Sequence, residues 1–241
     1  SNAFKNGILT VVLPQEAAIF TDGRYTLQVR EQVSADDWQF VGVPDSSVAQ
    51  WLGTHAGAGA RIGYDPWLHT RAWVDEARAA LAGVGAELVA VDGNPVDAVW
   101  PDRPAPSAAP LTVQPDALAG RSSASKRADV ADWLTTVGAK ATVIAALDSI
   151  AWLFNVRGAD VARTPVALSY AIVHRDGTAD LYVAPEKMTS QVAEHLGNAV
   201  RVHDRAAFAA ALDGLAGRRV AIDPALAVSA IWRRRASSSP G

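Results

Sequence analysis

The stretch from residue 146 to residue 183 constrains the fold of this 241-residue chain more than any other. It begins with a short apolar run around Ile150 that has helical spacing, and Asp148 can cap the start of that helix. A polar loop follows, and then two apolar runs meet at Asp176-Gly177, the dipeptide most typical of a tight β-hairpin turn. The stretch therefore predicts a helix, a loop and a hairpin within one α/β unit.

A second feature is an internal repeat. Residues 61–66 (RIGYDP) match residues 219–224 (RVAIDP), and each reads as a short apolar strand ended by Asp-Pro. An Asp-Gly pair lies upstream of both, at Asp22-Gly23 and at Asp176-Gly177, so we expect a hairpin turn at each. Each half then reads as hairpin, helix, strand and helix. The alternative is that the matches arose by chance, because such dipeptides are common.

The second half of the chain opens with elements that have no counterpart in the first. Ser125 can cap a helix over residues 126–137, which Gly138 ends, and residues 141–145 are apolar enough for a buried strand. Only residues 4–14 precede the first expected hairpin. The symmetry therefore predicts a truncated first domain that lacks its opening helix and strand.

A proline-rich connector at residues 100–110 divides the two halves, because closely spaced prolines preclude a helix and favour an extended chain. We predict a first domain at residues 4–104, a second domain at 111–232 and a disordered tail at 233–241. Residues 1–3 (SNA) read as the remnant of a cleaved expression tag.

Composition excludes several classes of protein. A net charge of -3 offers no electrostatic basis for binding nucleic acid or an anionic membrane. No apolar run approaches the roughly 18 residues of a membrane span. The absence of cysteine excludes disulfides and thiolate sites, which is typical of a reducing compartment. We therefore expect a cytoplasmic protein with no nucleic-acid partner and no membrane contact.

The sequence contains no recognisable catalytic or metal-binding motif. A Gly-x-Ser-x-Gly nucleophile motif is absent, and Ser123 and Lys126 match Ser-x-x-Lys only where serines are expected as helix caps. Asp36-Asp37 reads as a helix start or a surface turn rather than an acid–base pair. No histidine stands in a His-Glu-x-x-His pattern or at helical spacing from another. We expect no catalytic residue and no metal ligand here, and structural or surface roles for His55, His69, His174, His195 and His203.

The loop at residues 155–160 carries the strongest concentration of polar groups. It places Asn155, Arg157 and Asp160 directly after an apolar helix, and loops on rigid scaffolds often bind ligands or partners. The alternative is a structural role, in which Gly158 adopts a positive φ and the polar side chains satisfy local groups.

Three stretches resemble the Xaa-Pro aminopeptidase (aminopeptidase P) family, relatives of creatinase and prolidase. They are residues 20–28 (FTDGRYTLQ), the connector at 100–104 (WPDRP), and residues 147–158 (LDSIAWLFNVRG). Pro165-Val166 and Ser169-Tyr170 continue the last of these. The family often has serine and asparagine where this chain has Ala159 and Thr164, which weakens a substrate role for that loop.

The resemblance implies two similar α/β domains, each a mixed β-sheet flanked by helices. It implies that catalysis belongs to a separate C-terminal domain, where two manganese or similar divalent ions would activate water, so this chain alone would be inactive. That domain would be one partner and a second copy in a homodimer another. On this basis Arg24, Tyr25, Asn155, Arg157 and Asp160 are candidates for contacts at the substrate entrance or the dimer interface.

Two other hypotheses remain open. The chain could be a stand-alone binding or scaffold protein built from the same paired domains. It could also be an enzyme whose ligands are too scattered to see in the sequence, using His55 or His69.

Overall fold

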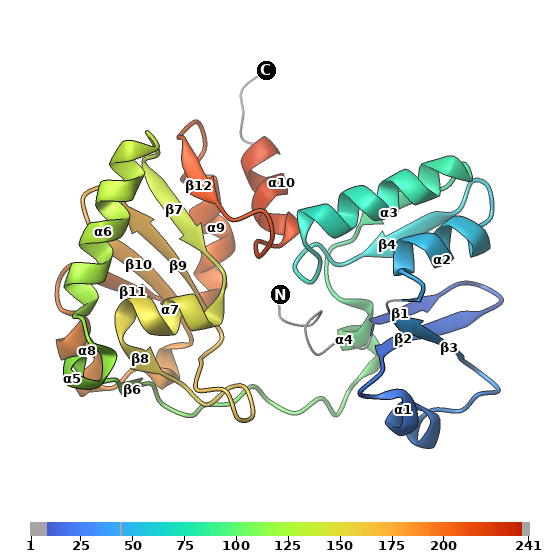
Figure 1. The fold of residues 1–241 in the computed structure, drawn as a ribbon, viewed down its shortest axis with the longest axis horizontal. Helices are drawn as coiled ribbons and strands as arrows, with labels where there is room; N and C mark the ends of the chain where they lie inside the picture. The colour runs from blue at the N-terminus through green and yellow to red at the C-terminus, as the bar shows by residue number, and fades with distance from the viewer. Residues whose placement is uncertain (1–8, 44, 238–241) are drawn as a thin grey trace. The chain divides into compact units, whose positions relative to one another are not determined.

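The structure, a computed structural model, describes residues 9–43 and 45–237. The chain divides into two compact units, Ser1–Val99 and Trp100–Gly241 (Figure 1). Each unit has its own hydrophobic core. The expected tag remnant at residues 1–3 and the last four residues of the expected tail lie outside the described residues.

The second unit contains a five-stranded mixed sheet with the strand order β11-β10-β9-β7-β12. Antiparallel pairing joins β10 to β9 and β9 to β7, whereas the outer strands β11 and β12 pair in parallel with their neighbours. A small antiparallel pair, β6-β8, lies apart from this sheet. In chain order the elements are β6 (Thr112–Val113), α5 (Asp116–Ala119), α6 (Ser123–Thr136), β7 (Ala141–Ile144), α7 (Leu147–Phe154), β8 (Val156–Arg157), β9 (Ser169–His174), β10 (Ala179–Val183), η2 (Pro185–Lys187), α8 (Ser190–Leu196), β11 (Val200–His203), η3 (Arg205–Ala207), α9 (Phe208–Asp213), β12 (Val220–Ile222) and α10 (Ser229–Ser237).

Successive side chains of β9 and β10 point to opposite faces of this sheet, as strand geometry requires. On one face Val173 and Leu181 are buried in a core cluster with Ile150 of α7. On the other face the ring of Tyr170 stacks on Phe208 of α9, with 4.0 Å between ring centroids. Helices therefore cover both faces, which confirms the predicted α/β class with a mixed sheet.

The first unit contains two small sheets, β1-β2-β3 and β4-β5. Strand β1 pairs antiparallel with β2, whereas β2 with β3 and β4 with β5 are parallel pairs. Helices α2 and α3 supply Trp51, Leu52 and Leu81 to one core shared with both sheets. The elements are β1 (Leu9–Val12), β2 (Ala17–Asp22), α1 (Thr26–Gln32), β3 (Gln39–Val43), α2 (Val48–His55), β4 (Arg61–Tyr64), α3 (Arg71–Gly83), β5 (Glu87–Ala90) and α4 (Pro95–Val99).

One of the two predicted hairpin turns is confirmed and the other is wrong. Asp176-Gly177 does join the antiparallel strands β9 and β10, and Gly177 has the positive φ that the turn needs. Asp22-Gly23 instead leads from β2 into α1, because β2 pairs in parallel with β3 and a parallel pair needs a crossover. The hairpin of the first unit turns earlier, where the Leu13 N–H donates to the Glu16 carbonyl at 2.8 Å.

Two predicted helix caps are displaced. The hydroxyl of Ser122, rather than Ser125, caps α6 by accepting from the Ser125 N–H at 3.2 Å. Helix α7 begins after Ala146, so Asp148 lies in its first turn rather than at the cap. A carboxylate in the first turn still interacts favourably with the helix dipole. The strand expected at residues 141–145 is confirmed as β7, one residue shorter.

The predicted disordered tail is wrong for residues 233–237. Helix α10 runs to Ser237, so these residues are helical. Within the described residues, none of the helices has both the length and the apolar character of a membrane span.

Candidate functional site

Asn155 is the centre of a buried hydrogen-bond network in the second unit. It ends α7 in the left-handed conformation (φ 50°), which asparagine tolerates better than most residues, and its side chain is fully buried. Its Oδ1 accepts from Lys126 Nζ at 2.6 Å, and its Nδ2 donates to Asp116 Oδ1 and to the Arg121 carbonyl, both at 2.8 Å. The amide thus connects α5, α6 and α7, because each polar atom is satisfied by a different segment.

Lys126 is the charged member of this network and is 1% exposed. Its ammonium also donates to the Trp152 carbonyl at 2.8 Å and lies 4.4 Å from the centroid of the Trp152 ring. Burial lowers the pKa of Lys126, and the positive charges of Arg157 and Arg121 lower it further. Lys126, which the sequence placed at a helix start, is therefore a buried cation whose hydrogen bonds connect α6 to the end of α7.

Asp160 forms a buried ion pair with Lys187, with 2.5 Å between Oδ1 and Nζ. Both side chains are at most 3% exposed. The second carboxylate oxygen accepts from the Leu168 N–H at 2.7 Å, and Lys187 also donates to the Ser107 carbonyl. The pair therefore anchors the 155–160 loop to η2 and to the segment before β6.

The remaining loop residues also bond locally. The Arg157 guanidinium donates to the Ala151 and Val156 carbonyls at 3.0 and 2.9 Å. Gly158 does not have the positive φ that the structural alternative assigned to it; Asn155 has it instead. The loop at 155–160 is thus held by hydrogen bonds within its own unit, and whether it also contacts a substrate or a partner stays a prediction.

Arg24 and Tyr25 lie at an exposed turn of the first unit. Asp22 accepts from both the backbone and the side chain of Arg24, with 2.6 Å between Oδ2 and the nearest guanidinium nitrogen. The side-chain hydrogen bond from Arg24 lowers the pKa of Asp22. Beside this pair, Leu27 is 79% exposed. The turn therefore presents a cation and an apolar side chain at the surface beside a half-buried aromatic ring, and its role stays a prediction.

A charged cluster on the sheet of the second unit was not predicted. Asp180 of β10 is 7% exposed and accepts from His174 at 2.6 Å, His203 at 2.8 Å and Arg201 at 2.9 Å. The only sequence signal was the recurrence of polar residues at alternate positions of apolar strands, which places them on one face. Their convergence depends on the register that sets Asp180 opposite Arg201.

Changing Asp180 to Asn should make the stability of the second unit less dependent on pH. Burial alone would raise the pKa of Asp180, but the hydrogen bonds from His174, His203 and Arg201 hold it below its ordinary value of 3.8. The charged carboxylate therefore stabilises the fold above that pH, and this contribution is lost as the pH falls through the lowered pKa. We expect the free energy of unfolding of the variant to be about 2 kcal/mol below that of the unmodified protein at pH 7. The difference should be smaller at pH 3, as measured by urea unfolding.

The control for that prediction is Asp37→Asn, which changes an exposed carboxylate and should alter stability little at either pH. An equal loss for the Asp180 variant at pH 3 and pH 7 would contradict the prediction.

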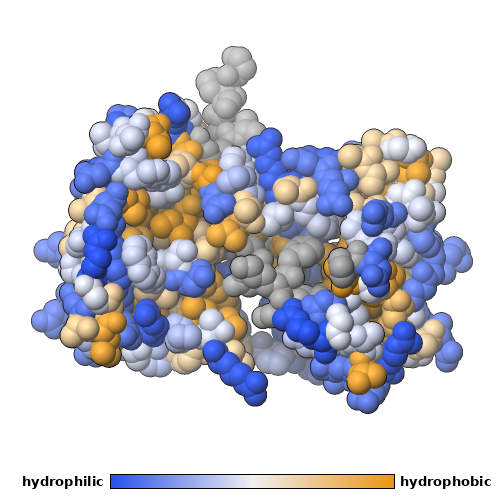
Figure 2. All heavy atoms as spheres, viewed as in Figure 1, coloured by the Kyte–Doolittle hydropathy of each residue, from blue (hydrophilic) through white to orange (hydrophobic). Residues whose placement is uncertain are grey.

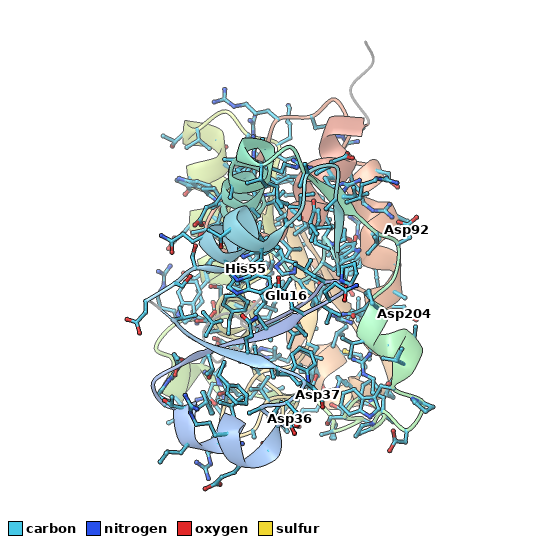
Figure 3. The ribbon with its side chains drawn as sticks, turned by 90° about the vertical axis from the view of Figure 1, so that its right-hand side faces the viewer. Glu16, Asp36, Asp37, His55, Asp92 and Asp204 are labelled. Carbon is cyan, nitrogen blue, oxygen red and sulfur yellow. The ribbon has the colours of Figure 1, made fainter. Side chains whose placement is uncertain are left out.

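The two histidines considered as scattered ligands, His55 and His69, each stack on a tryptophan ring. Figure 3 shows Asp36 and Asp37 together on the loop after α1, with His55 well apart from them on α2. His55 stacks on Trp51 at 4.0 Å, and its Nδ1 lies 2.8 Å from the Trp51 carbonyl oxygen. Burial lowers the pKa of His69 to about 4, which keeps this ring neutral at pH 7. Within residues 9–43 and 45–237, no group of three or more His, Asp and Glu side chains is arranged to hold a metal ion.

The second unit also has an open groove of about 700 Å³ between α6, β7 and β12. Its walls are mostly apolar and include Trp133, Val143 and Ile222. Figure 2 shows hydrophobic surface beside α6 and β7, on the face that it presents. Such a lining suits an apolar side chain of a partner better than a charged ligand.

Comparison with known proteins places both units in one family. The family model described as "Creatinase/Prolidase N-terminal domain" matches residues 3–99, and a second model of the same description matches residues 102–239. The two matches correspond to the two units.

Curated relatives are similar along most of this chain. Aminopeptidase P1 of Lotus japonicus is 36% identical over 85% of this chain and 31% of its own length. A probable Xaa-Pro aminopeptidase P of Aspergillus clavatus is 40% identical over 79% of this chain and 29% of its own length. Aminopeptidase P2 of Arabidopsis thaliana is 35% identical over 89% and 31%. The chain therefore spans less than a third of the length of these relatives.

A solved structure has the same fold. The crystal structure of X-prolyl aminopeptidase from Caenorhabditis elegans, described as a cytosolic enzyme with a di-nuclear active site, matches with a TM-score of 0.86. It is 27% identical in sequence, and the match covers 95% of this chain and 40% of that one.

Proposed function

Because this chain belongs to the creatinase/prolidase N-terminal domain family, we propose that its two units form the N-terminal, non-catalytic region of an Xaa-Pro aminopeptidase. One observation carries this proposal. The similarity to aminopeptidases P runs through nearly the whole chain, yet it occupies only 29–31% of the relatives' lengths. That ratio is expected of a regulatory or structural region attached to a larger catalytic portion.

In this proposal the whole protein cleaves the bond between an N-terminal residue and a following proline. Proline has no amide proton and a fixed φ, so a peptide of this kind needs a restricted pocket. The structural neighbour is described as having a di-nuclear active site, and two divalent ions, manganese in our proposal, would activate the attacking water. The described residues of this chain do not form such a site, so no catalytic step is assigned to them.

The two units would then support dimer formation and shape the entrance to the active site, in a cytoplasmic enzyme. Arg24 suits an intermolecular contact because it is exposed, with the half-buried Tyr25 beside it. Asn155, Arg157 and Asp160 would act through the shape of their loop, since their side chains already bond within the second unit.

Peptide cleavage tests the proposal directly. We expect the purified 241-residue chain to show no turnover of Xaa-Pro peptides, with or without added manganese, and no stoichiometric metal. The full-length product of the same gene should bind metal and cleave such peptides. Proline-dependent turnover by the 241-residue chain would contradict the assignment, and so would a full-length protein that lacks both metal and activity.

A further inference from the structure

Basic side chains gather at one end of the five-stranded sheet in the second unit. Lys140 lies directly before β7, and Arg218 lies two residues before β12. Arg175 directly follows β9 at the same end, and Arg201 is the second residue of β11. The pairing register sets these strand ends level with one another. Four cations from four separate segments are therefore brought to one end of the sheet, although the whole chain has a net charge of -3.

The four basic side chains line one open pocket of about 630 Å³. The other lining residues are His174, Asp176 and Thr178, so the lining contains no apolar side chain. Pockets of a few hundred Å³ are the usual size for small ligands, but most of them are lined by apolar and aromatic side chains. The size of this pocket therefore suits a small molecule, and its lining suits a charged one.

The neighbouring carboxylates do not neutralise the cations of this pocket. Asp176 accepts from the N–H and the hydroxyl of Thr178 at 2.9 and 2.6 Å. Asp180, close to the pocket, is already shared among two histidines and an arginine. Within residues 9–43 and 45–237, neither Lys140 nor Arg175 has an ion-pair partner. Like charges held near one another repel, so the cluster favours an anion from outside the chain.

Hydrogen bonds of the backbone hold the walls of the pocket in place. The Lys140 N–H donates to the Arg219 carbonyl at 2.7 Å, and the Arg175 N–H donates to the Lys140 carbonyl at 3.0 Å. The guanidinium of Arg175 is oriented as well, because its Nε donates to the Ala139 carbonyl at 2.7 Å. Groups that are ordered before a ligand arrives lose less conformational entropy when they bind it.

We propose that this pocket binds a small anion that carries several phosphate groups, such as inorganic triphosphate or the triphosphate of a nucleotide. A guanidinium presents a planar fork of donors that matches two phosphate oxygens, and an ammonium adds a point charge. The outermost strands, β11 and β12, are four strand spacings apart, which is roughly 19 Å at about 4.8 Å per spacing. Cations that come from the whole width of the sheet suit an anion with several charged groups better than a single phosphate.

An acidic segment of another protein fits this pocket less well. The centre of a protein interface is usually formed by aromatic and apolar side chains, with the charged groups at its rim. The lining of this pocket offers no apolar side chain for such a centre. It offers only charged and polar groups in a concave site of small-ligand size, which favours the phosphate compound.

Isothermal titration calorimetry of the 241-residue chain with inorganic triphosphate, in buffer without divalent ions, tests the proposal. We expect saturable binding at one site. Lys140→Glu should weaken it about tenfold or more, because it reverses one charge of the cluster. Lys140 is exposed and its side chain bonds to no described residue, so the variant should fold normally.

The matched control is Arg78→Glu, which changes the net charge by the same amount at an exposed position of α3 in the first unit. It should leave the affinity within about twofold, because a distant surface charge is screened by salt.

Adenosine triphosphate separates the two sources of the phosphate groups. An affinity equal to that of inorganic triphosphate would assign the pocket to the phosphate chain alone, and a tighter one would assign it to a nucleotide. No saturable binding of either compound would overturn the proposal, and so would undiminished binding by the Lys140 variant. Binding of a hexaglutamate peptide but not of triphosphate would overturn it in favour of an acidic protein segment. These outcomes do not depend on peptidase activity.

Discussion

Replacing Gly158 by alanine should destabilise the second unit by about 3 kcal/mol or more. A Cβ at this position would lie 2.6 Å from the Ala167 Cβ, 2.7 Å from the Ala167 nitrogen and 2.8 Å from the Val166 carbonyl carbon. Two of these atoms belong to the backbone, which cannot rotate away as a flexible side chain could. The loop would have to separate from residues 165–167, and the hydrogen bond from the Asp160 N–H to the Val166 carbonyl would be strained.

Urea unfolding followed by tryptophan fluorescence measures this effect, with Gly57→Ala as the control. A Cβ on Gly57 would meet no atom within 4 Å, and its φ is not positive. Alanine there should leave stability unchanged or raise it slightly, because it restricts the unfolded chain. An unfolding midpoint for the Gly158 variant equal to that of the unmodified protein would show that the loop does not pack against residues 166–167.

Breaking the buried ion pair between Asp160 and Lys187 should destabilise the second unit by about as much as the Gly158 substitution. Asp160→Asn keeps the shape of the side chain but leaves the Lys187 ammonium in a buried site without its counter-charge. Removal of one partner of a buried ion pair typically costs about 3–5 kcal/mol. Lys187→Met should cost a similar amount by leaving the carboxylate unpaired.

The double variant distinguishes a buried pair from two independent contributions. With both charges removed, the loss should be well below the sum of the single losses, because neither charge is left unpaired. The control is Glu87→Gln, which breaks the exposed pair with Arg61 at 3.6 Å, where both side chains are about 70% exposed. That change should cost less than about 1 kcal/mol. If the double variant lost as much unfolding free energy as the two single variants together, the two residues would not be coupled, and the prediction would be wrong.

The local sequence predicted elements well where short-range chemistry decides them. The Asp176-Gly177 hairpin, strand β7 and the helix around Ile150 all lie close to where the pattern placed them. Each depends on turn residues or apolar spacing within a few positions, so no distant contact was needed to predict it.

Asp22-Gly23 shows where the same reasoning fails. The dipeptide is compatible with a hairpin turn and equally with a strand-to-helix turn, in which the Asp22 carboxylate accepts from the Arg24 N–H at 2.9 Å. The choice follows from the parallel pairing of β2 with β3, which is a contact between segments separated by a helix. The repeat itself holds in the order of elements, but its hairpins align at residues 13–16 and 174–178.

The polar loop at 155–160 shows the same limit at the level of side chains. Its composition indicated a surface that could bind a ligand, with a structural role as the alternative. In the structure Asn155 and Asp160 bond to Lys126 and Lys187, which stand far from them in the sequence. No spacing rule joins such residues, so their burial could not be predicted.

The sequence by itself determined the α/β class, the two-unit organisation and the family. These properties depend on local periodicity, on turn chemistry and on motifs that remain recognisable in a linear chain. Only the tertiary structure decided which strands pair in parallel and where Asp180 meets His174 and His203. Strand register and side-chain burial are set by contacts between distant segments, and those contacts exist only in the folded chain.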